Sequence, residues 1–217
     1  MLRPFAFAAL VLPAAALAQP TPKATIDLVY GTNRINRATP DARPVDVLMV
    51  SKDNGNAHGR TILLFTSPRV AFRPPPGAAA RKVAPVPELI PVAAEQNDLN
   101  IVVLEPFDGE NDISALQIAR GTERGRPTLE LYRATRLFTG RNTVLTAPVP
   151  VRIEHWVLEG PNETIGPRYR FGDRPDRTTT ARYCSATNAL HYEAGLAWPD
   201  GWDLQETCDG CGGASQR

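Results

Sequence analysis

The chain has 217 residues, of which 42% are hydrophobic, so it holds enough apolar material for one core or for two small ones. Its 24 basic and 23 acidic residues leave a net charge of +1. This balance argues against a nucleic-acid partner, which favours a strongly basic domain, and against electrostatic binding to a membrane surface.

The first eighteen residues have the pattern of a signal peptide. Arg3 precedes an uncharged apolar run over residues 5–17, and residues 16–18 place small side chains at the two positions that signal peptidase reads. That run is too short for a membrane-spanning helix, which needs about 20 residues. The preference for arginine over lysine indicates a bacterial source. We therefore expect cleavage after Ala18, a mature chain without a transmembrane segment, and a periplasmic or secreted location.

The N-terminal half of the mature chain predicts strands. Residues 24–30 alternate apolar and polar side chains, which is typical of a strand, and we expect a turn at residues 31–33 followed by a loop. Residues 44–51 and 60–67 are two β-branched or apolar runs separated by the turn sequence Asp-Asn-Gly-Asn. These two runs predict a hairpin.

Residues 73–94 are rich in proline and alanine. Because proline fixes φ and lacks an amide donor, such a run is poorly suited to a sheet, and we expect an exposed, partly polyproline-II connection. The connection either divides the chain into two units or forms a long loop within one. We prefer a single β-rich domain over residues 19–211, since the first unit has too few strands to stand alone. Residues 212–217 are expected to be a disordered tail.

The C-terminal half continues the strand pattern. Short apolar or alternating segments separated by turn signals cover residues 99–106, 115–119, 129–138, 143–158 and 169–171. Within them, Val151, Ile153, His155 and Val157 share one face of a regular strand. Only residues 178–197 favour a helix as an alternative. The pattern predicts an all-β fold, mainly an antiparallel sandwich or barrel.

All three cysteines lie near the C-terminus. In an exported chain, Cys184 is expected to form a disulfide with Cys208 or Cys211, closing a loop worth about 3 kcal/mol in the chain-entropy model. One thiol is then left over, either free or available to join a protein partner or a second copy. The disulfide-stapled segment would clasp the C-terminus onto the β-core, with Trp198 and Trp202 as its apolar contacts.

Two other interpretations of the cysteines remain open. Cys184, His191, Cys208 and Cys211 have the ligand types of a Cys3His zinc site, although the spacing from Cys184 to His191 is uncommon. A redox-active C-x-x-C is disfavoured because the acidic flanks oppose a thiolate and glycines follow where a helix should begin. We otherwise expect no cofactor.

No catalytic motif stands out in the sequence. The primary hypothesis is therefore a non-catalytic, exported protein with an envelope-associated, binding or assembly role. The alternative is a periplasmic enzyme, either a hydrolase or a thiol-disulfide oxidoreductase, whose site forms only in three dimensions. Its candidate residues are His155, His191, Asp203, Glu206 and the cysteines.

Overall fold

The computed structural model describes residues 21–53, 58–66, 87–94, 98–100, 103–105, 113–139, 147–162 and 167–199. The strands are β1 (Thr25–Ile26), β2 (Gly31–Ile35), β3 (Val45–Asp53), β4 (His58–Thr66), β5 (Glu88–Leu89), β6 (Val92–Ala94), β7 (Asp98–Asn100), β8 (Val103–Glu105), β9 (Ser114–Glu123), β10 (Arg126–Arg136), β11 (Val151–Glu159) and β12 (Arg170–Thr178). One helix, α1 (Ala186–Ala194), completes this part of the chain.

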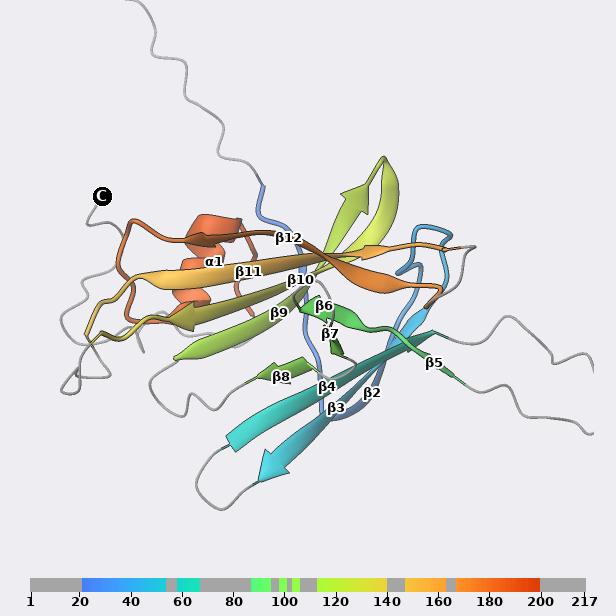
Figure 1. The fold of residues 1–217 in the computed structure, drawn as a ribbon, viewed down its shortest axis with the longest axis horizontal. Coiled ribbons are helices and arrows are strands. Elements are labelled where there is room, and N and C mark those ends of the chain that lie inside the picture. The colour runs from blue at the N-terminus through green and yellow to red at the C-terminus, as the bar shows by residue number, and fades with distance from the viewer. Residues whose placement is uncertain are drawn as a thin grey trace, which may run out of the picture.

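The described strands form two sheets, as Figure 1 shows. The larger sheet has the order β1-β9-β10-β11-β12-β6-β7, and the smaller sheet has the order β2-β3-β4-β5 with β8 also paired to β4. Neighbouring strands are antiparallel except β12 and β6, which pair in parallel. The predicted all-β, mainly antiparallel fold is confirmed, as is the hairpin, which is β3 and β4.

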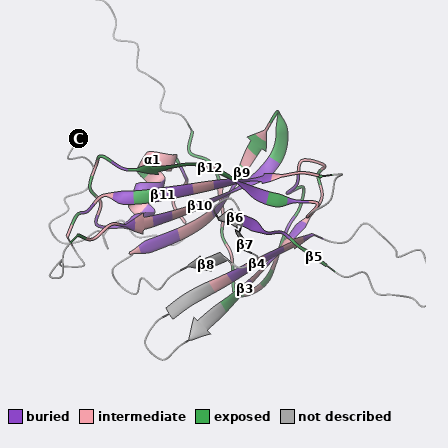
Figure 2. Ribbon diagram, in the orientation of Figure 1, coloured by how far each residue is buried: buried purple, intermediate pink, exposed green. Residues whose placement is uncertain are grey.

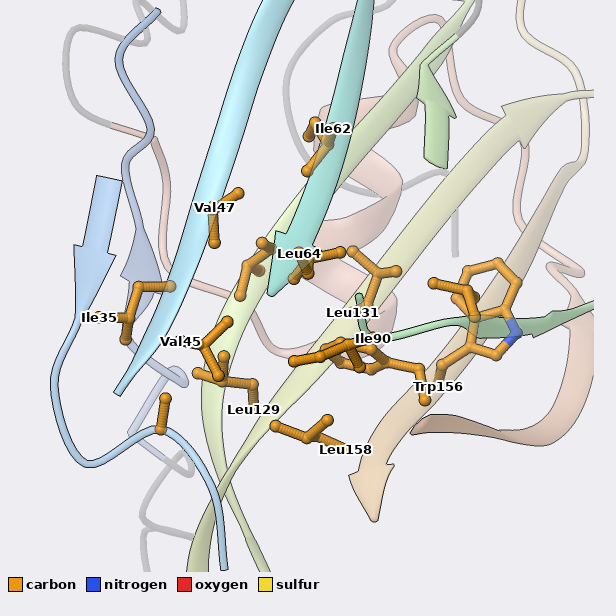
Figure 3. Packing of buried hydrophobic residues seen from close by; sticks show 14 of the residues in the cluster. Ile35, Val45, Val47, Ile62, Leu64, Ile90, Leu129, Leu131, Trp156 and Leu158 are labelled. Carbon is orange, nitrogen blue, oxygen red and sulfur yellow. The ribbon is translucent and has the colours of Figure 1, made fainter. Parts of the chain in front are cut away.

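The main core lies between the two sheets. Because side chains alternate across a strand, the apolar positions of each sheet point at the other sheet. Figure 3 shows these side chains meeting between the sheets, and Figure 2 shows the buried stretches along the same strands. The residues labelled in Figure 3, all of them buried, are Ile35, Val45, Val47, Ile62, Leu64, Ile90, Leu129, Leu131, Trp156 and Leu158.

Helix α1 covers the opposite face of the larger sheet, where it contacts β9, β10 and β11. The sheet presents small side chains there, including Ala115, Ala119 and Ala134, so the helix can approach closely with Ala189 and Leu190. The Ser185 side chain caps the helix by accepting a hydrogen bond from the Asn188 amide at 2.9 Å. The helix lies within the segment for which the sequence offered a helix as an alternative. It is not long and apolar enough to span a membrane, and it is the one helix in the described part of the chain.

Three local predictions are wrong. Of the strand expected over residues 24–30, only Thr25–Ile26 forms a strand, β1. The expected turn and loop at residues 31–35 form strand β2, whose backbone pairs with β3 in the register Gly31↔Met49 to Ile35↔Val45. The end of the proline-rich connection is also not an exposed coil. Residues 88–89 and 92–94 form β5 and β6, and Ile90 and Val92 are buried. Pro91 is accommodated because it lies between the strands, where its carbonyl accepts a hydrogen bond from Phe171. Residues 73–86 lie outside the described residues.

A polar clamp joins the loop after β2 to the start of β12. The buried Tyr169 hydroxyl donates to Asp41, at 2.7 Å from Oδ1 and 2.8 Å from Oδ2. Asp41 also accepts from the Thr39 hydroxyl at 2.7 Å and pairs with Arg43 at 3.1 Å. Burial opposes the Asp41 charge, but the hydrogen bonds from Thr39 and Tyr169 and the charge on Arg43 outweigh it and lower the pKa of Asp41. The clamp therefore connects the two sheets through hydrogen bonds to the charged Asp41.

Replacing Tyr169 with Phe should lower the free energy of unfolding by about 1.5–3 kcal/mol, because the hydrogen bond to a carboxylate is lost and the ring stays in place. Urea denaturation measures the change. A double-mutant cycle with Asp41→Ala should show that most of the loss disappears when the acceptor is gone. Two additive losses would contradict the clamp.

Candidate functional site

A cluster of ionisable side chains that includes the predicted site residue His155 lies on the helix-covered face of the larger sheet. Glu130 and Tyr132 are two residues apart in β10, so their side chains point to the same face. Tyr132 pairs with His155 of β11 across the sheet, and their rings stack with centroids 4.3 Å apart and an interplanar angle of 4°. The prediction that Val151, Ile153, His155 and Val157 share one face agrees with this register.

The Glu130 carboxylate is the centre of the cluster. Its Oε2 atom lies 2.7 Å from the Lys23 ammonium and 3.1 Å from His155 Nε2, and it also accepts a hydrogen bond from the Tyr132 hydroxyl. Lys23 donates a second hydrogen bond to the Tyr132 hydroxyl at 2.9 Å. The Glu130 side chain is only 7% exposed, so the carboxylate is a buried charge with three donors on one oxygen.

These contacts set the protonation states of the carboxyl and the phenol. Burial alone would raise the pKa of Glu130, but the hydrogen bonds from His155, Lys23 and Tyr132 outweigh burial and lower that pKa to about 2. Burial and the hydrogen bond to Glu130 raise the pKa of Tyr132 to about 12. Glu130 is therefore ionised and Tyr132 is neutral across the physiological pH range.

Glycines in the neighbouring strands make room for the acids on this face. A Cβ atom on Gly121 would lie 2.0 Å from Oε1 of Glu130, so the carboxylate rests directly over the bare backbone of β9. The arrangement recurs on the same face in the neighbouring strand pair, where a Cβ on Gly172 of β12 would lie 2.4 Å from Oε1 of Glu159 of β11. Glu159 there pairs with Arg174 at 2.9 Å. A glycine inside a strand usually marks a close approach of this kind.

Lys23 is placed by the backbone on both of its sides. Its amide donates to the Gly195 carbonyl at 2.7 Å, and its carbonyl accepts from the Ala197 amide at 2.8 Å. The segment that follows α1 therefore runs alongside the start of the described chain, in a parallel bridge between Lys23 and Leu196. The Lys23 side chain then reaches the sheet and is 42% exposed.

The cluster resembles a catalytic dyad in one respect, because a carboxylate contacts a histidine that is 26% exposed. Efficient general acid or base catalysis needs a group whose pKa lies near the working pH. Glu130 and Tyr132 are far from that range, and the carboxylate oxygen that contacts His155 also binds Lys23 and Tyr132. The geometry is that of a satisfied, buried ion pair.

His191 has a separate set of partners. It lies in α1, its Nδ1 donates to the Leu196 carbonyl at 2.7 Å, and its ring stacks on Trp198 with centroids 3.8 Å apart. Because a carbonyl oxygen only accepts, Nδ1 carries a proton, and Nε2 is the acceptor in the neutral ring. Tyr192, which is 49% exposed, meets both rings edge-on.

The structure describes only some of the other predicted site residues. Cys184 is buried immediately before the helix cap. Its proposed partners Cys208 and Cys211, together with Trp202, Asp203 and Glu206, lie outside the described residues. The zinc set and the disulfide therefore stay predictions. Within the described ranges, no group of three or more His, Cys, Asp or Glu side chains could hold a metal ion.

A second candidate site is the outer face of the smaller sheet, which points away from the core. We define it by the apolar side chains that alternate with the buried ones on β3, β4 and β5, namely Leu48, Val50, Leu63, Phe65 and Leu89. The register places Leu48 opposite Leu63 and Phe65 opposite Leu89, so the five form one patch. Val50 is 38% exposed and Leu89 36%.

No protein-family model matches this chain, and no curated protein matches it. The fold is similar to the crystal structure of CarG, with a TM-score of 0.54 and 16% sequence identity. The similarity covers 80% of this chain and 98% of that chain. At this identity, the likeness concerns the arrangement of the strands and carries no residue roles.

Proposed function

We propose that the protein is an exported, non-catalytic binding or assembly protein of the bacterial envelope. The observation that carries this proposal is the apolar outer face of the smaller sheet. On the larger sheet, α1 covers the corresponding outward face, whereas no described helix or sheet packs on the outer face of the smaller one. A contiguous apolar surface on a folded domain is typical of an interaction site.

The chemistry of the Glu130 cluster supports a non-catalytic role. Glu130, Lys23 and Tyr132 bind one another, and neither the carboxyl nor the phenol has a pKa suited to proton transfer near neutral pH. The cluster instead ties the start of the mature chain to the middle of the larger sheet. Its role is structural.

One observation favours an enzyme as the second candidate. His155 Nε2 lies 3.1 Å from Glu130, and a carboxylate in that position can orient a histidine that acts as a general base through its other nitrogen. A hydrolase of this kind would lose activity when Glu130 or His155 is replaced, while a structural cluster would lose stability. Unfolding measurements on Glu130→Gln, made beside activity measurements, separate these outcomes.

The disulfide clasp is part of the same proposal. Cys184 is buried next to α1, and in an oxidising compartment it would join Cys208 or Cys211 and fasten the end of the chain. Intact-mass measurement of the protein purified from its own host, with thiol alkylation, tests export and pairing together. The expected mass corresponds to a chain beginning at Gln19 with one alkylated cysteine. Stoichiometric zinc would contradict the clasp.

Photo-crosslinking in the source bacterium tests the binding role. A photoreactive residue at position 50, on the outer face of the smaller sheet, should give a protein adduct. The same residue at Thr122, which is exposed on β9 of the larger sheet, is the matched control and should give none. Adducts from neither position would contradict a protein-binding role for this face.

A further inference from the structure

The β9–β10 hairpin projects beyond the rest of the larger sheet. The register of β10 with β11 covers residues 130–136, so among the described strands residues 126–129 of β10 pair only with β9. Arg124 and Gly125 form the turn, with φ of 51° and 74°, and positive φ at both turn residues is typical of a tight two-residue hairpin. Figure 1 shows the hairpin extending away from β11 and β12, and Figure 2 shows that its end is exposed. Residues 120–127, the hairpin tip, therefore lie on a convex projection.

Arginines dominate the exposed surface of the hairpin tip. The Arg124 side chain is 92% exposed, and its one ion pair among the described residues, with Glu123, is 4.0 Å long. Arg126 is exposed as well and forms no hydrogen bond or ion pair with a described residue. Exposed guanidinium groups without a close acid keep their N–H donors available to an anion from outside the chain.

Arg37 adds a third exposed arginine beside the tip. The loop that follows β2 reaches the hairpin, because Arg120 NH1 donates to the Asn36 carbonyl at 3.2 Å. Arg37, the next residue of this loop, is exposed and has no polar partner within the part of the chain that the structure describes. This contact brings two arginine-bearing segments together at one end of the molecule.

The acids of these two segments are already bound within the fold. Glu123 Oε2 lies 3.5 Å from Arg174, and the Glu123 side chain is 34% exposed against 92% for Arg124. Asp41 is the acceptor of the polar clamp and also pairs with Arg43 at 3.1 Å. The exposed charge at this end of the molecule is therefore positive. The net charge of +1 for the whole chain averages over this local asymmetry.

We propose that the hairpin tip, together with Arg37, docks on the phosphate headgroups of an anionic lipid surface. The proposal names a partner for the envelope-associated role proposed above and rests on that role. A guanidinium presents its N–H donors in a planar fork that matches two phosphate oxygens. Arg37, Arg124 and Arg126 make these contacts, and each of them then gains the anionic partner that it lacks within the fold.

The shape and composition of the tip favour a lipid surface over other phosphates. A convex tip has no walls that converge on a single phosphate ion, whereas a flat surface offers it several headgroups at once. Single-stranded nucleic acid is usually held by aromatic side chains that stack on its bases, and residues 120–127 (RGTERGRP) include no aromatic residue. Each arginine near an anionic bilayer strengthens the attraction, so three of them give reversible binding that salt screens.

Co-sedimentation with lipid vesicles tests this docking. The mature protein should bind equimolar phosphatidylglycerol–phosphatidylcholine vesicles at low ionic strength, dissociate as salt is added, and not bind pure phosphatidylcholine. Replacing both Arg124 and Arg126 with Gln should lower the partition coefficient by on the order of 25-fold, because each arginine near such a surface contributes about fivefold.

Arg126→Gln and Arg182→Gln form a matched pair, because each removes one exposed arginine. Arg182 adjoins Tyr183, which bridges Val149 before the start of β11, whereas the hairpin tip lies toward the other end of that strand. Arg126→Gln should weaken vesicle binding about fivefold, and Arg182→Gln should leave it unchanged.

The unfolding midpoint, which should match wild type in every variant, separates a failure to fold from a failure to bind. If the change at Arg124 disturbs the turn, Arg37→Gln combined with Arg126→Gln tests the same surface. A wild type that does not bind the mixed vesicles or binds pure phosphatidylcholine equally well overturns the proposal, as does a folded double variant with undiminished binding. Release by inorganic phosphate at constant ionic strength, or tighter binding to duplex DNA than to vesicles, also contradicts it.

The proposed function fails on different observations, namely an uncleaved signal peptide or the absence of adducts from position 50. A chain that is processed and crosslinks from position 50, but does not bind the vesicles, would overturn the lipid docking alone.

Discussion

Replacing Glu130 with Gln should lower the free energy of unfolding by about 2–3 kcal/mol, equivalent to a fall in Tm of roughly 5–10 °C for a domain of this size. The change keeps the shape of the side chain but removes the charge that Lys23, Tyr132 and His155 share. The shift of the Glu130 pKa from 4.5 to about 2 sets the upper limit at roughly 3 kcal/mol, and the solvent-exposed end of Lys23 reduces it. Thermal and urea unfolding measure the loss.

The same substitution should change the pH dependence of stability. The folded-state pKa of Glu130 lies below its ordinary value, so between about 4.5 and about 2 the unfolded chain binds more protons than the folded chain. The stabilisation from Glu130 is therefore fully present above pH 4.5 and is lost as the pH falls toward 2. The difference in stability between wild type and Glu130→Gln should shrink over that interval.

Glu159→Gln is the matched control for this prediction. Glu159 also rests over a glycine and pairs with arginines, but its side chain is 32% exposed, so its loss should cost less than 1 kcal/mol. If Glu130→Gln proves no more destabilising than Glu159→Gln, the cluster is not a structural ion pair. The enzyme hypothesis for His155 would then gain support.

Replacing Gly160 with Ala should destabilise the protein by about 3–5 kcal/mol, because the substitution meets two separate costs. Gly160 has φ of +128°, which side-chain-bearing residues rarely adopt. Its added Cβ would also lie 2.5 Å from the Arg168 carbonyl oxygen and 2.8 Å from the Tyr169 ring. The ring cannot move aside easily, since its hydroxyl is bound to Asp41. The free energy of unfolding in urea, extrapolated to water, measures the effect.

Gly125→Ala separates the two costs. Gly125 has φ of +74° in the turn between β9 and β10, and a Cβ there would meet no atom within 4 Å. Only the backbone cost remains, so we expect a loss of about 1 kcal/mol. Equal losses at the two positions would show that the clash of the added Cβ with Arg168 and Tyr169 costs no stability.

The fold was predictable from the sequence where the strand-like alternation of apolar residues, or an apolar run bounded by turn residues, was clear. The β3–β4 hairpin has apolar runs on both sides of a strong turn signal, and alternation placed Val151, Ile153 and Val157 on one face. The prediction failed where tertiary contacts outweighed local pattern. Residues 31–35 read as polar, yet edge strand β2 tolerates polar residues because its outward side faces water. Ile90 is buried between prolines because its amide bonds to the Leu64 carbonyl of β4.

The candidate site was predictable only through His155. Glu130 and Tyr132 alternate with the apolar Leu129 and Leu131 in β10, and this spacing was a usable signal that they share a face. Lys23 could not have been paired with them, because 107 residues separate it from Glu130 and only the tertiary fold joins them. The apolar outer face of the smaller sheet was visible in the unbroken apolar run of β4 over residues 62–65.

The parallel bridge between Lys23 and Leu196 joins the segment before β1 to the segment that follows α1. Gly195 and Ala197 supply the backbone partners that hold Lys23, and Lys23 in turn neutralises the buried charge of Glu130. A chain that stops before α1 therefore loses more than this helix, because Lys23 loses both of its backbone partners and is no longer held beside the buried Glu130 carboxylate. The contacts around Lys23 can therefore form only once the segment that follows α1 is present.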